Sequence, residues 1–170
     1  GGAGTIVDEL EISLSGGAYA AYISGTSINT TGQTSVVIRT RRTATANGCT
    51  TSAYNTVSWT VNALPVGPII AKTPNDIEVC AGTPLSITVT TAGTGGAVSS
   101  QDEYRFSTNN GANWSSWSTT IPNFAAVTGT NIVESRRTLT GIGCTTANGN
   151  TVSWTVNALP VGPVITKSPN

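Results

Sequence analysis

Apolar and polar residues alternate along most of this chain with a period of two residues, the period of a β-strand that buries one face. In the segment 103–108, Tyr104 and Phe106 fall on one side, and Glu103 and Arg105 fall on the other. The segments 85–91, 131–139 and 151–158 follow the same pattern, and a short stretch around Phe124 adds another strand. No segment of the sequence has the period of an amphipathic helix.

Turn-forming residues separate these segments. Gly, Pro or Asn interrupts the pattern every 8 to 12 residues, Asn109-Asn110-Gly111 is a turn signal, and 141–150 is predicted to be a hairpin loop. Six or seven short strands in about 95 residues predict an all-β fold, a β-sandwich with immunoglobulin-like architecture.

The chain contains a long internal repeat. Residues 48–75 recur as residues 143–170, with 22 of 28 positions identical and an offset of 95. This period fits one whole small domain and exceeds the 20 to 50 residues that are typical of solenoid repeats. We therefore interpret the chain as tandem modules of about 95 residues, arranged end to end.

The repeat also predicts the domain boundaries. Residues 1–3 match residues 95–97, so the counterpart of 76–94 is missing ahead of Gly1. The predicted division is an immunoglobulin-like module lacking its first strands at 1–65, a complete module at 66–160, and the first strand of a following module at 161–170. The joints at 64–68 and 159–163 read Leu-Pro-Val-Gly-Pro, and their prolines should hold neighbouring modules semi-rigidly as an extended rod.

Composition narrows the classes of partner. The chain has eight basic and eight acidic side chains, so it lacks the charge excess that binds nucleic acid or an anionic membrane surface. No run of 18 apolar residues is present, so no membrane insertion is expected. Abundant Thr, Ser, Gly, Asn and Val are typical of a secreted all-β protein, and the low net charge would permit lateral bundling of rods.

The three cysteines allow several disulfide arrangements. Cys49 and Cys144 are repeat counterparts, and the simplest prediction pairs Cys80 with Cys144 and leaves Cys49 to a partner outside the chain. In an immunoglobulin-like topology, however, Cys80 and Cys144 would lie at opposite poles, and the bonds would then join neighbouring modules. Three reduced thiols are the remaining alternative.

Two charges reverse sign together between the repeats. Glu11 corresponds to Arg105, and Arg39 corresponds to Glu134. Opposite charges that face each other across adjacent strands stabilise a sheet, whereas like charges destabilise it. The joint reversal therefore predicts two cross-strand pairs, Glu11 with Arg39 and Arg105 with Glu134.

The sequence offers little for catalysis, and we predict no enzyme activity. It has no histidine, so the commonest general base and metal ligand is absent. Asp8 with Glu9, and Asp102 with Glu103, are adjacent pairs whose side chains would point to opposite faces of a strand. The three aspartates are also too dispersed for a calcium site, so we expect no catalytic residue, metal or cofactor.

An aromatic pair is a candidate binding patch. Trp114 and Trp117 lie three residues apart, and Tyr19 and Tyr22 take the same places in the first repeat when a one-residue gap is allowed. These side chains either pack on the sheet or stack on sugar rings or a partner. The segment 114–118 reads W-S-S-W-S, a cytokine-receptor signature in which arginines stack on tryptophans, but its mid-domain position leads us to interpret the match as chance.

Several longer motifs carry a resemblance to a known family. They are VCAGTPL at 79–85, EYRFSTNNG from Glu103, ESRRT from Glu134, GCTT from Gly143 and TVSWTVNALP from Thr151. Together they resemble immunoglobulin-like repeats in very large secreted surface proteins of Bacteroidota, including adhesins related to gliding motility and exported by the type IX system. The resemblance implies a bacterial extracellular or cell-surface location.

Two functions are consistent with the sequence. The first is a non-catalytic structural repeat in a long extracellular filament or adhesin shaft, whose partners are neighbouring copies of the module. The second is repeated binding of surface glycans or a protein through the aromatic pairs, with avidity rising with module number.

Overall fold

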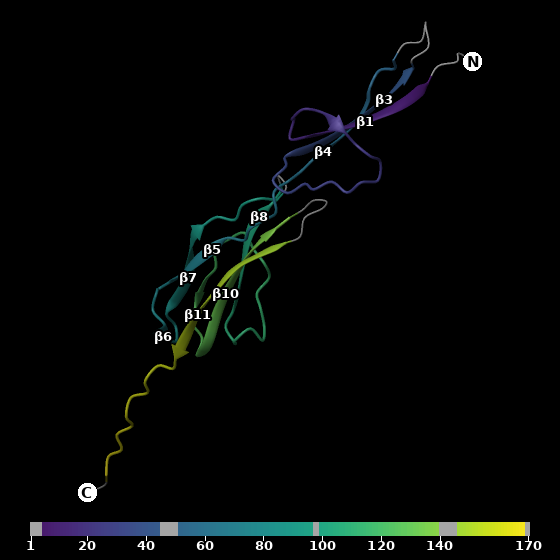
Figure 1. The fold of residues 1–170 in the computed structure, drawn as a ribbon. Helices are drawn as coiled ribbons and strands as arrows, with labels where there is room; N and C mark the ends of the chain where they lie inside the picture. Colours follow the sequence, from purple (N-terminus) through teal and green to yellow (C-terminus); the bar gives the residue numbers. More distant parts are fainter. Residues whose placement is uncertain (1–4, 45–50, 97–98, 140–145, 169–170) are drawn as a thin grey trace. The chain divides into compact units, whose positions relative to one another are not determined.

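The computed structural model describes residues 5–44, 51–96, 99–139 and 146–168, and the fold of this part of the chain is all-β (Figure 1). The chain divides into two compact units, Gly1–Ala63 (unit 1) and Leu64–Asn170 (unit 2). Among the described residues, no helix is long and apolar enough to cross a membrane.

Unit 1 contains one antiparallel sheet with the strand order β2-β1-β3-β4. Its strands are β1 (Ile6–Leu14), β2 (Ala20–Ala21), β3 (Ser35–Ala44) and β4 (Asn55–Thr60). Val36 is buried, but every residue of β4 is exposed, including Val57 and Trp59. The described residues of unit 1 contain no second sheet that would cover this face.

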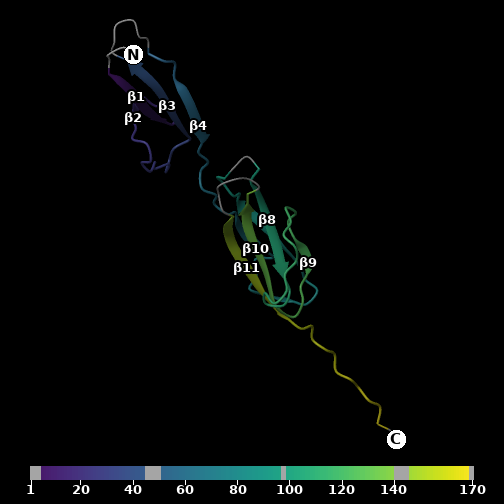
Figure 2. The ribbon, with the colours of Figure 1, turned by 90° about the vertical axis from the view of Figure 1, so that its right-hand side faces the viewer.

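Unit 2 is a sandwich of two sheets (Figures 1 and 2). One sheet has the order β5-β7-β9, with β5 (Ile69–Thr73), β7 (Pro84–Thr91) and β9 (Asn123–Ala125). The other has the order β6-β11-β10-β8, with β6 (Glu78–Cys80), β11 (Ala147–Asn157), β10 (Gly129–Thr138) and β8 (Gln101–Ser107). β6 runs parallel to β11, and the other pairs are antiparallel. This division of consecutive strands between two sheets is the immunoglobulin-like arrangement, and it confirms the predicted fold class.

The core of unit 2 lies between these two sheets. Its fully or nearly buried members come from both, and they are Ile70, Leu85, Ile87, Tyr104, Ala126, Val133, Trp154 and Val156. Phe106 and Phe124 extend the core with stacked rings whose centroids are 4.2 Å apart. The period-two pattern therefore identified the inward face of β7, β8 and β11.

The start of β11 differs from the prediction. Residues 147–150 were expected in a hairpin loop, but β11 begins at Ala147. The register shifts between Glu134 and Arg136 of β10, where β11 has one extra residue, so that Arg136 faces Asn148 and Arg137 faces Ala147. A bulge of this kind leaves no signature in an alternation pattern, because it shifts the register by one residue on one strand only.

The chain enters and leaves unit 2 at opposite ends of β11. Near the start of β11, the carbonyl oxygens of Pro68 and Asn150 lie 3.0 and 3.1 Å from the Ser135 hydroxyl, whose single hydrogen either can accept. At its end, Asn157 is the register partner of Cys80. Eleven residues of strand separate these ends by roughly 33 Å.

The structure describes one of the three cysteines. Cys80 is an exposed free thiol at the end of β6, where it is the register partner of Asn157. Cys49 and Cys144 lie outside the described residues. The pairing of Cys80 with Cys144 and the alternative bonds between neighbouring modules therefore stay predictions.

Candidate functional site

Three cross-strand ion pairs join β8 and β10 in unit 2. On the outward face, Arg105 faces Glu134 at 2.8 Å, and Arg136 faces Glu103 at 2.7 Å. The two residues of each pair are direct register partners. In the first pair the base is on β8 and the acid on β10, and in the second pair this order is reversed. The structure thus brings together Arg105 and Glu134, as the charge reversal predicted.

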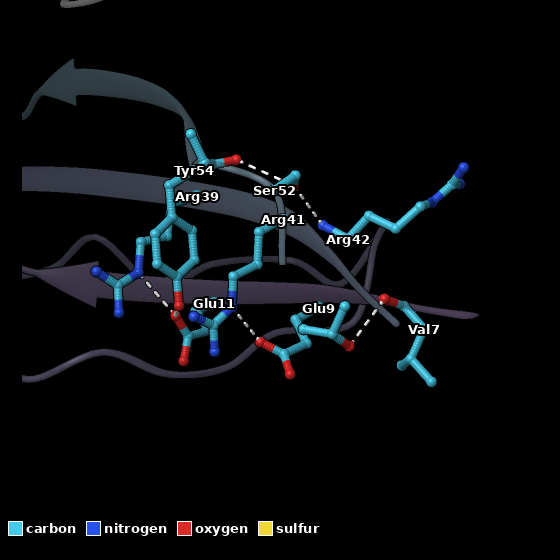
Figure 3. A network of polar contacts seen from close by, with 10 residues as sticks. Val7, Glu9, Glu11, Arg39, Arg41, Arg42, Ser52 and Tyr54 are labelled. Atoms are coloured by element: carbon cyan, nitrogen blue, oxygen red, sulfur yellow. Dashed lines mark hydrogen bonds and ion pairs between the residues drawn. The ribbon is translucent and has the colours of Figure 1, made fainter. Parts of the chain in front are cut away.

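Unit 1 repeats these rows between β1 and β3 (Figure 3). Glu11 faces Arg39 at 2.7 Å, and Glu9 faces Arg41 at 2.6 Å. In the Glu11–Arg39 pair the acid and the base have exchanged strands relative to the Arg105–Glu134 pair of unit 2. In the Glu9–Arg41 pair they occupy the same strands as in the Glu103–Arg136 pair. Glu11 and Arg39 are the second predicted pair, so both pairs from the sequence are present as ion pairs.

Aromatic rings alternate with the arginines on the outward face of unit 2. The Arg105 guanidinium lies 4.3 Å from the ring centroid of Trp114 and 4.5 Å from that of Trp117. The Arg136 guanidinium covers Trp117 at 4.1 Å. We call the row Trp114, Arg105, Trp117 and Arg136 the unit 2 ladder. Such stacked cations contribute about 0.5–1 kcal/mol each at exposed sites.

A tight turn positions the two tryptophans beside β8. Asn110 and Gly111 both adopt positive φ, 57° and 82°, as the predicted turn requires. The chain then returns antiparallel to β8, where Ser118 exchanges backbone hydrogen bonds of 2.8 and 3.0 Å with Tyr104. This pairing places Trp117 directly over the Arg105 side chain.

The ladder in unit 1 uses a different second ring. The Arg39 guanidinium lies 3.5 Å from the ring of Tyr19 and 4.0 Å from that of Tyr54, and Arg41 lies 4.7 Å from Tyr54. The Tyr54 hydroxyl also donates a 3.0 Å hydrogen bond to Glu11. We call the row Tyr19, Arg39, Tyr54 and Arg41 the unit 1 ladder.

Tyr22 therefore does not take the place of Trp117. The backbone N–H of Tyr22 donates to the Leu10 carbonyl, and in unit 2 the backbone N–H of Ser118 donates in the same way to the Tyr104 carbonyl. The Tyr22 hydroxyl donates to the Thr26 carbonyl at 2.8 Å. The connection after β1 is two residues shorter than the one after β8, so the structural counterpart of Trp117 is Ala21. Tyr54 supplies the missing ring from the segment before β4.

The repeat counterpart of Tyr54 is Gly149, which explains the exchange. In unit 2, Gly149 lines a pocket of about 210 Å³ together with Arg105, Trp117 and Glu134. A Cβ atom at Gly149 would overlap the Pro68 carbonyl oxygen and the Ser135 hydroxyl. A ring at this position is thus excluded in unit 2, where Trp117 provides it from the other side.

Hydrogen bonds within the ion pairs lower the pKa of two carboxylates, Glu11 and Glu103. Hydrogen bonds from Arg39 and Tyr54 lower the pKa of Glu11 below its ordinary value. Burial acts to raise the pKa of Glu103, but hydrogen bonds from Thr138 and Arg136 outweigh it, and the pKa is lowered. Burial and the hydrogen bond to Glu11 raise the pKa of Tyr54. These shifts have structural causes, and each carboxylate is committed to a cation on the neighbouring strand.

Arg137 has a role that the sequence reasoning missed. Its neighbour Arg136 points to the outward face and stacks on Trp117. Arg137 instead forms a mostly buried ion pair with Asp102 at 2.8 Å and donates to the Gly95 carbonyl at 3.0 Å. Asp102 also accepts the backbone N–H of Gly93 at 2.8 Å. Period-two counting places both residues on the inward face and provides the signal for this pair.

The W-S-S-W-S segment stacks with arginines, as its five-residue signature would imply. We interpreted that match as chance from its position, but Arg105 lies between the two tryptophans of the motif. Arg105 thus stacks on both rings of the candidate binding patch, and Arg136 stacks on Trp117 as well. In the part of the chain that the structure describes, no group of three or more carboxylate or thiol side chains is placed to hold a metal ion.

Comparison with known proteins gives a distant structural likeness. No protein-family model and no curated protein sequence matches the chain. Among solved structures, it is similar to murine CEACAM1b, with a TM-score of 0.38 and 8% sequence identity. The likeness covers 76% of this chain and 61% of the other, so the chain spans less than two thirds of that structure's length. At this identity and TM-score the likeness carries no functional argument, and the immunoglobulin-like assignment rests on the strand order of unit 2.

Proposed function

We propose that this chain is a non-catalytic structural repeat from the shaft of a long filament or adhesin on a bacterial cell surface. The observation that carries the proposal is the path of the chain through unit 2, which enters at one end of β11 and leaves at the other. A module that the chain enters at one end and leaves at the other can be joined in series to further copies through short proline-containing joints. Neighbouring copies of the module would then be the main partners.

The strand order of unit 2 also suits a shaft under tension. β6 and β11 are parallel, with Thr155 opposite Glu78 and Asn157 opposite Cys80. Tension pulls β6 toward its amino end and β11 toward its carboxyl end, which loads their hydrogen bonds in shear. In shear, the bonds between two strands are strained together instead of one after another. These include the Ala81 N–H to the Asn157 carbonyl at 2.9 Å and the Thr155 N–H to the Ile77 carbonyl at 3.0 Å.

The ladders support a structural role over the alternative of glycan or protein binding. Their arginines are paired with carboxylates and stacked on the rings that the binding hypothesis would use. A surface of satisfied ion pairs and covered rings stiffens a sheet in water and leaves few groups for a ligand.

Single-molecule pulling on the 170-residue chain tests the load-bearing function. Ala81→Pro removes an N–H between the two loaded strands and should lower the unfolding force of unit 2. Phe124→Leu is the control, because it weakens the core from β9, which is not a neighbour of β6 or β11. If the two variants lower the force equally for the same loss of equilibrium stability, the shear argument is wrong.

A binding assay separates the two functions. The chain and the double variant Trp114→Ala with Trp117→Ala should behave alike on glycan arrays and in pull-downs from cell surfaces. Selective binding that disappears in the double variant would favour the adhesion module. Labelling of intact producing cells with an antibody against the repeat should match that of permeabilised cells, as a surface location requires.

A further inference from the structure

Unit 1 exposes a sheet face whose counterpart in unit 2 is core. Trp59 is 51% exposed, whereas its repeat counterpart Trp154 is 1% exposed. Val57 is exposed as well, while its counterpart Val152 packs against the core of unit 2. We call the face formed by Asn55, Val57 and Trp59 of β4 the open face. Because the same residues are covered in unit 2, the structure itself shows which kind of segment fits them.

In unit 2, strand β5 covers this face through side-chain contacts with β11. Asn150 clamps one residue, since its Oδ1 accepts the Ile70 N–H at 2.6 Å and its Nδ2 donates to the Ile70 carbonyl at 2.8 Å. The Lys72 ammonium donates to the Ser153 carbonyl at 3.1 Å. The Trp154 indole N–H donates to the Pro74 carbonyl at 2.9 Å. The Ile70 side chain is buried at 2% exposure.

The open face retains the groups that make these contacts. Asn150, Ser153 and Trp154 correspond to Asn55, Ser58 and Trp59. The covering segment is present in the chain as well, because 161–170 repeats 66–75. In the structure the described part of this segment is exposed, with Ile165, the counterpart of Ile70, at 91% exposure. Figure 1 shows it as a trace that continues beyond β11 without a strand assignment.

We propose that the open face of unit 1 binds residues 161–170 of a second copy of this chain. Ile165 occupies the place of Ile70, with its backbone clamped by Asn55, and Lys167 reaches the Ser58 carbonyl. This inference concerns assembly and does not depend on the shaft function, because a shaft made of one covalent chain needs no such contact.

The covering segment can follow the path of β5 on the open face only from Ile165 onward, and not over the Leu-Pro-Val-Gly-Pro residues before it. In unit 2 the Pro68 carbonyl lies against Gly149, where a Cβ atom would overlap it. Unit 1 has Tyr54 at this position, so Pro163 cannot occupy the place of Pro68. β5 also pairs with β7 in unit 2, and the described residues of unit 1 supply no such strand. The contact is therefore weaker than its intramolecular counterpart.

The geometry of this contact is head to tail. Each copy offers one open face and one covering segment, and the two surfaces are different. An interface of this kind closes only if its rotation forms a ring, and otherwise it extends into a linear polymer. Association should therefore continue past the dimer as the concentration rises.

Nuclear magnetic resonance of the full chain with a synthetic peptide VGPVITKSPN tests the contact under reducing conditions. The Trp59 indole and the Asn55 side-chain amide resonances should shift on titration. The Trp154 indole should not, since it already donates to Pro74. Shifts at Trp154 without shifts at Trp59, or no shift at all, would overturn the proposal.

Two substitutions in the covering segment provide a matched pair. Ile165→Asp replaces the counterpart of buried Ile70, whereas Val164→Asp replaces the counterpart of Ile69, which is 51% exposed in unit 2. Ile165→Asp should weaken peptide binding and self-association by at least about tenfold. Val164→Asp should change them by no more than about twofold. Both residues are exposed in the structure, so neither variant endangers the fold.

Sedimentation velocity gives the assembly readout. The weight-average sedimentation coefficient of the chain should rise with concentration and should not level off at a dimer. Asn55→Ala should suppress this rise, as should Ile165→Asp. A strictly monomeric chain, or equal effects of Ile165→Asp and Val164→Asp, would refute docking of this segment on the open face.

Discussion

Removing the indole of Trp154 should destabilise unit 2 far more than removing that of Trp59 destabilises unit 1. The two residues are repeat counterparts on β11 and β4, within the same local sequence TVSWTVNALPVGP. Their surroundings differ, since Trp154 is enclosed between two sheets and donates a hydrogen bond to Pro74, whereas Trp59 is half exposed. The comparison therefore isolates tertiary burial from local sequence.

The magnitudes follow from burial. Replacement of a fully buried tryptophan by alanine typically costs about 3–5 kcal/mol, because apolar contact is lost and a cavity remains. Trp59 keeps about half of its surface in water, so Trp59→Ala forfeits at most about half the burial and leaves no enclosed cavity. We expect a loss of less than about 2 kcal/mol in unit 1. Trp154→Phe should cost about 1 kcal/mol for the hydrogen bond, plus a smaller packing loss.

Native-state hydrogen exchange, measured by mass spectrometry, reads each unit separately. Peptides from β7 and β10 report on unit 2, and peptides from β1 and β3 report on unit 1. Trp154→Ala should accelerate exchange in unit 2 by at least about 100-fold, and Trp154→Phe provides the same readout if the alanine variant does not fold. Low protein concentration keeps the open face free of a second copy. Equal effects of Trp59→Ala and Trp154→Ala would mean that unit 1 is covered in solution, which would refute the burial argument.

Three further predictions concern single contacts. Gly67→Ala should lower the thermal midpoint of unit 2, because the added Cβ would overlap the backbone of β11. The counterpart Gly162→Ala should leave the midpoint unchanged, since no atom lies within 4 Å of its added Cβ, and equal midpoints for the two variants would contradict this. The lowered pKa of Glu103 means that its carboxylate stabilises unit 2 at neutral pH, and this contribution should fade as the pH drops from the unfolded value of about 4.3 through the folded pKa. Glu103→Gln should flatten that acid dependence in urea titrations at several pH values, and an unchanged slope would argue against it. Arg105→Lys keeps a cation for Glu134 but loses the planar stacking on two rings. Chemical unfolding should show that the free energy of unfolding of unit 2 falls by about 1 kcal/mol. An unchanged free energy of unfolding would mean that the ladder does not stabilise the unit.

The sequence predicted the strands and their inward faces well. Tyr104 and Phe106 were placed on the same side of their strand; Tyr104 lies in the core and Phe106 packs against it. The alternation of apolar and polar residues is a local property, and it survives whatever else the chain contacts. The charge reversal between repeats located two cross-strand pairs, because register partners on adjacent strands contact each other directly.

Features that depend on distant segments were missed. The bulge that lets β11 begin at Ala147 follows from pairing with β10, and the three-residue β6 exists only as a parallel partner of β11. The strand order also places Cys80 beside Asn157, which no local pattern in the sequence indicates. Tyr54 entered the unit 1 ladder in place of Tyr22 because a shorter connection changed the register of β2.

By itself, the sequence determined that this is an all-β protein with an internal sequence repeat, which segments form its strands, and which charges face each other across adjacent strands. These properties depend on period-two alternation and on nearest neighbours in a sheet. Only the tertiary structure decided that Trp154 is core while Trp59 is exposed, and that the rings flanking Arg105 and Arg39 come from different segments. The physical reason is that burial requires a second layer, and β5 and β7, which supply it in unit 2, have no counterpart among the described residues of unit 1.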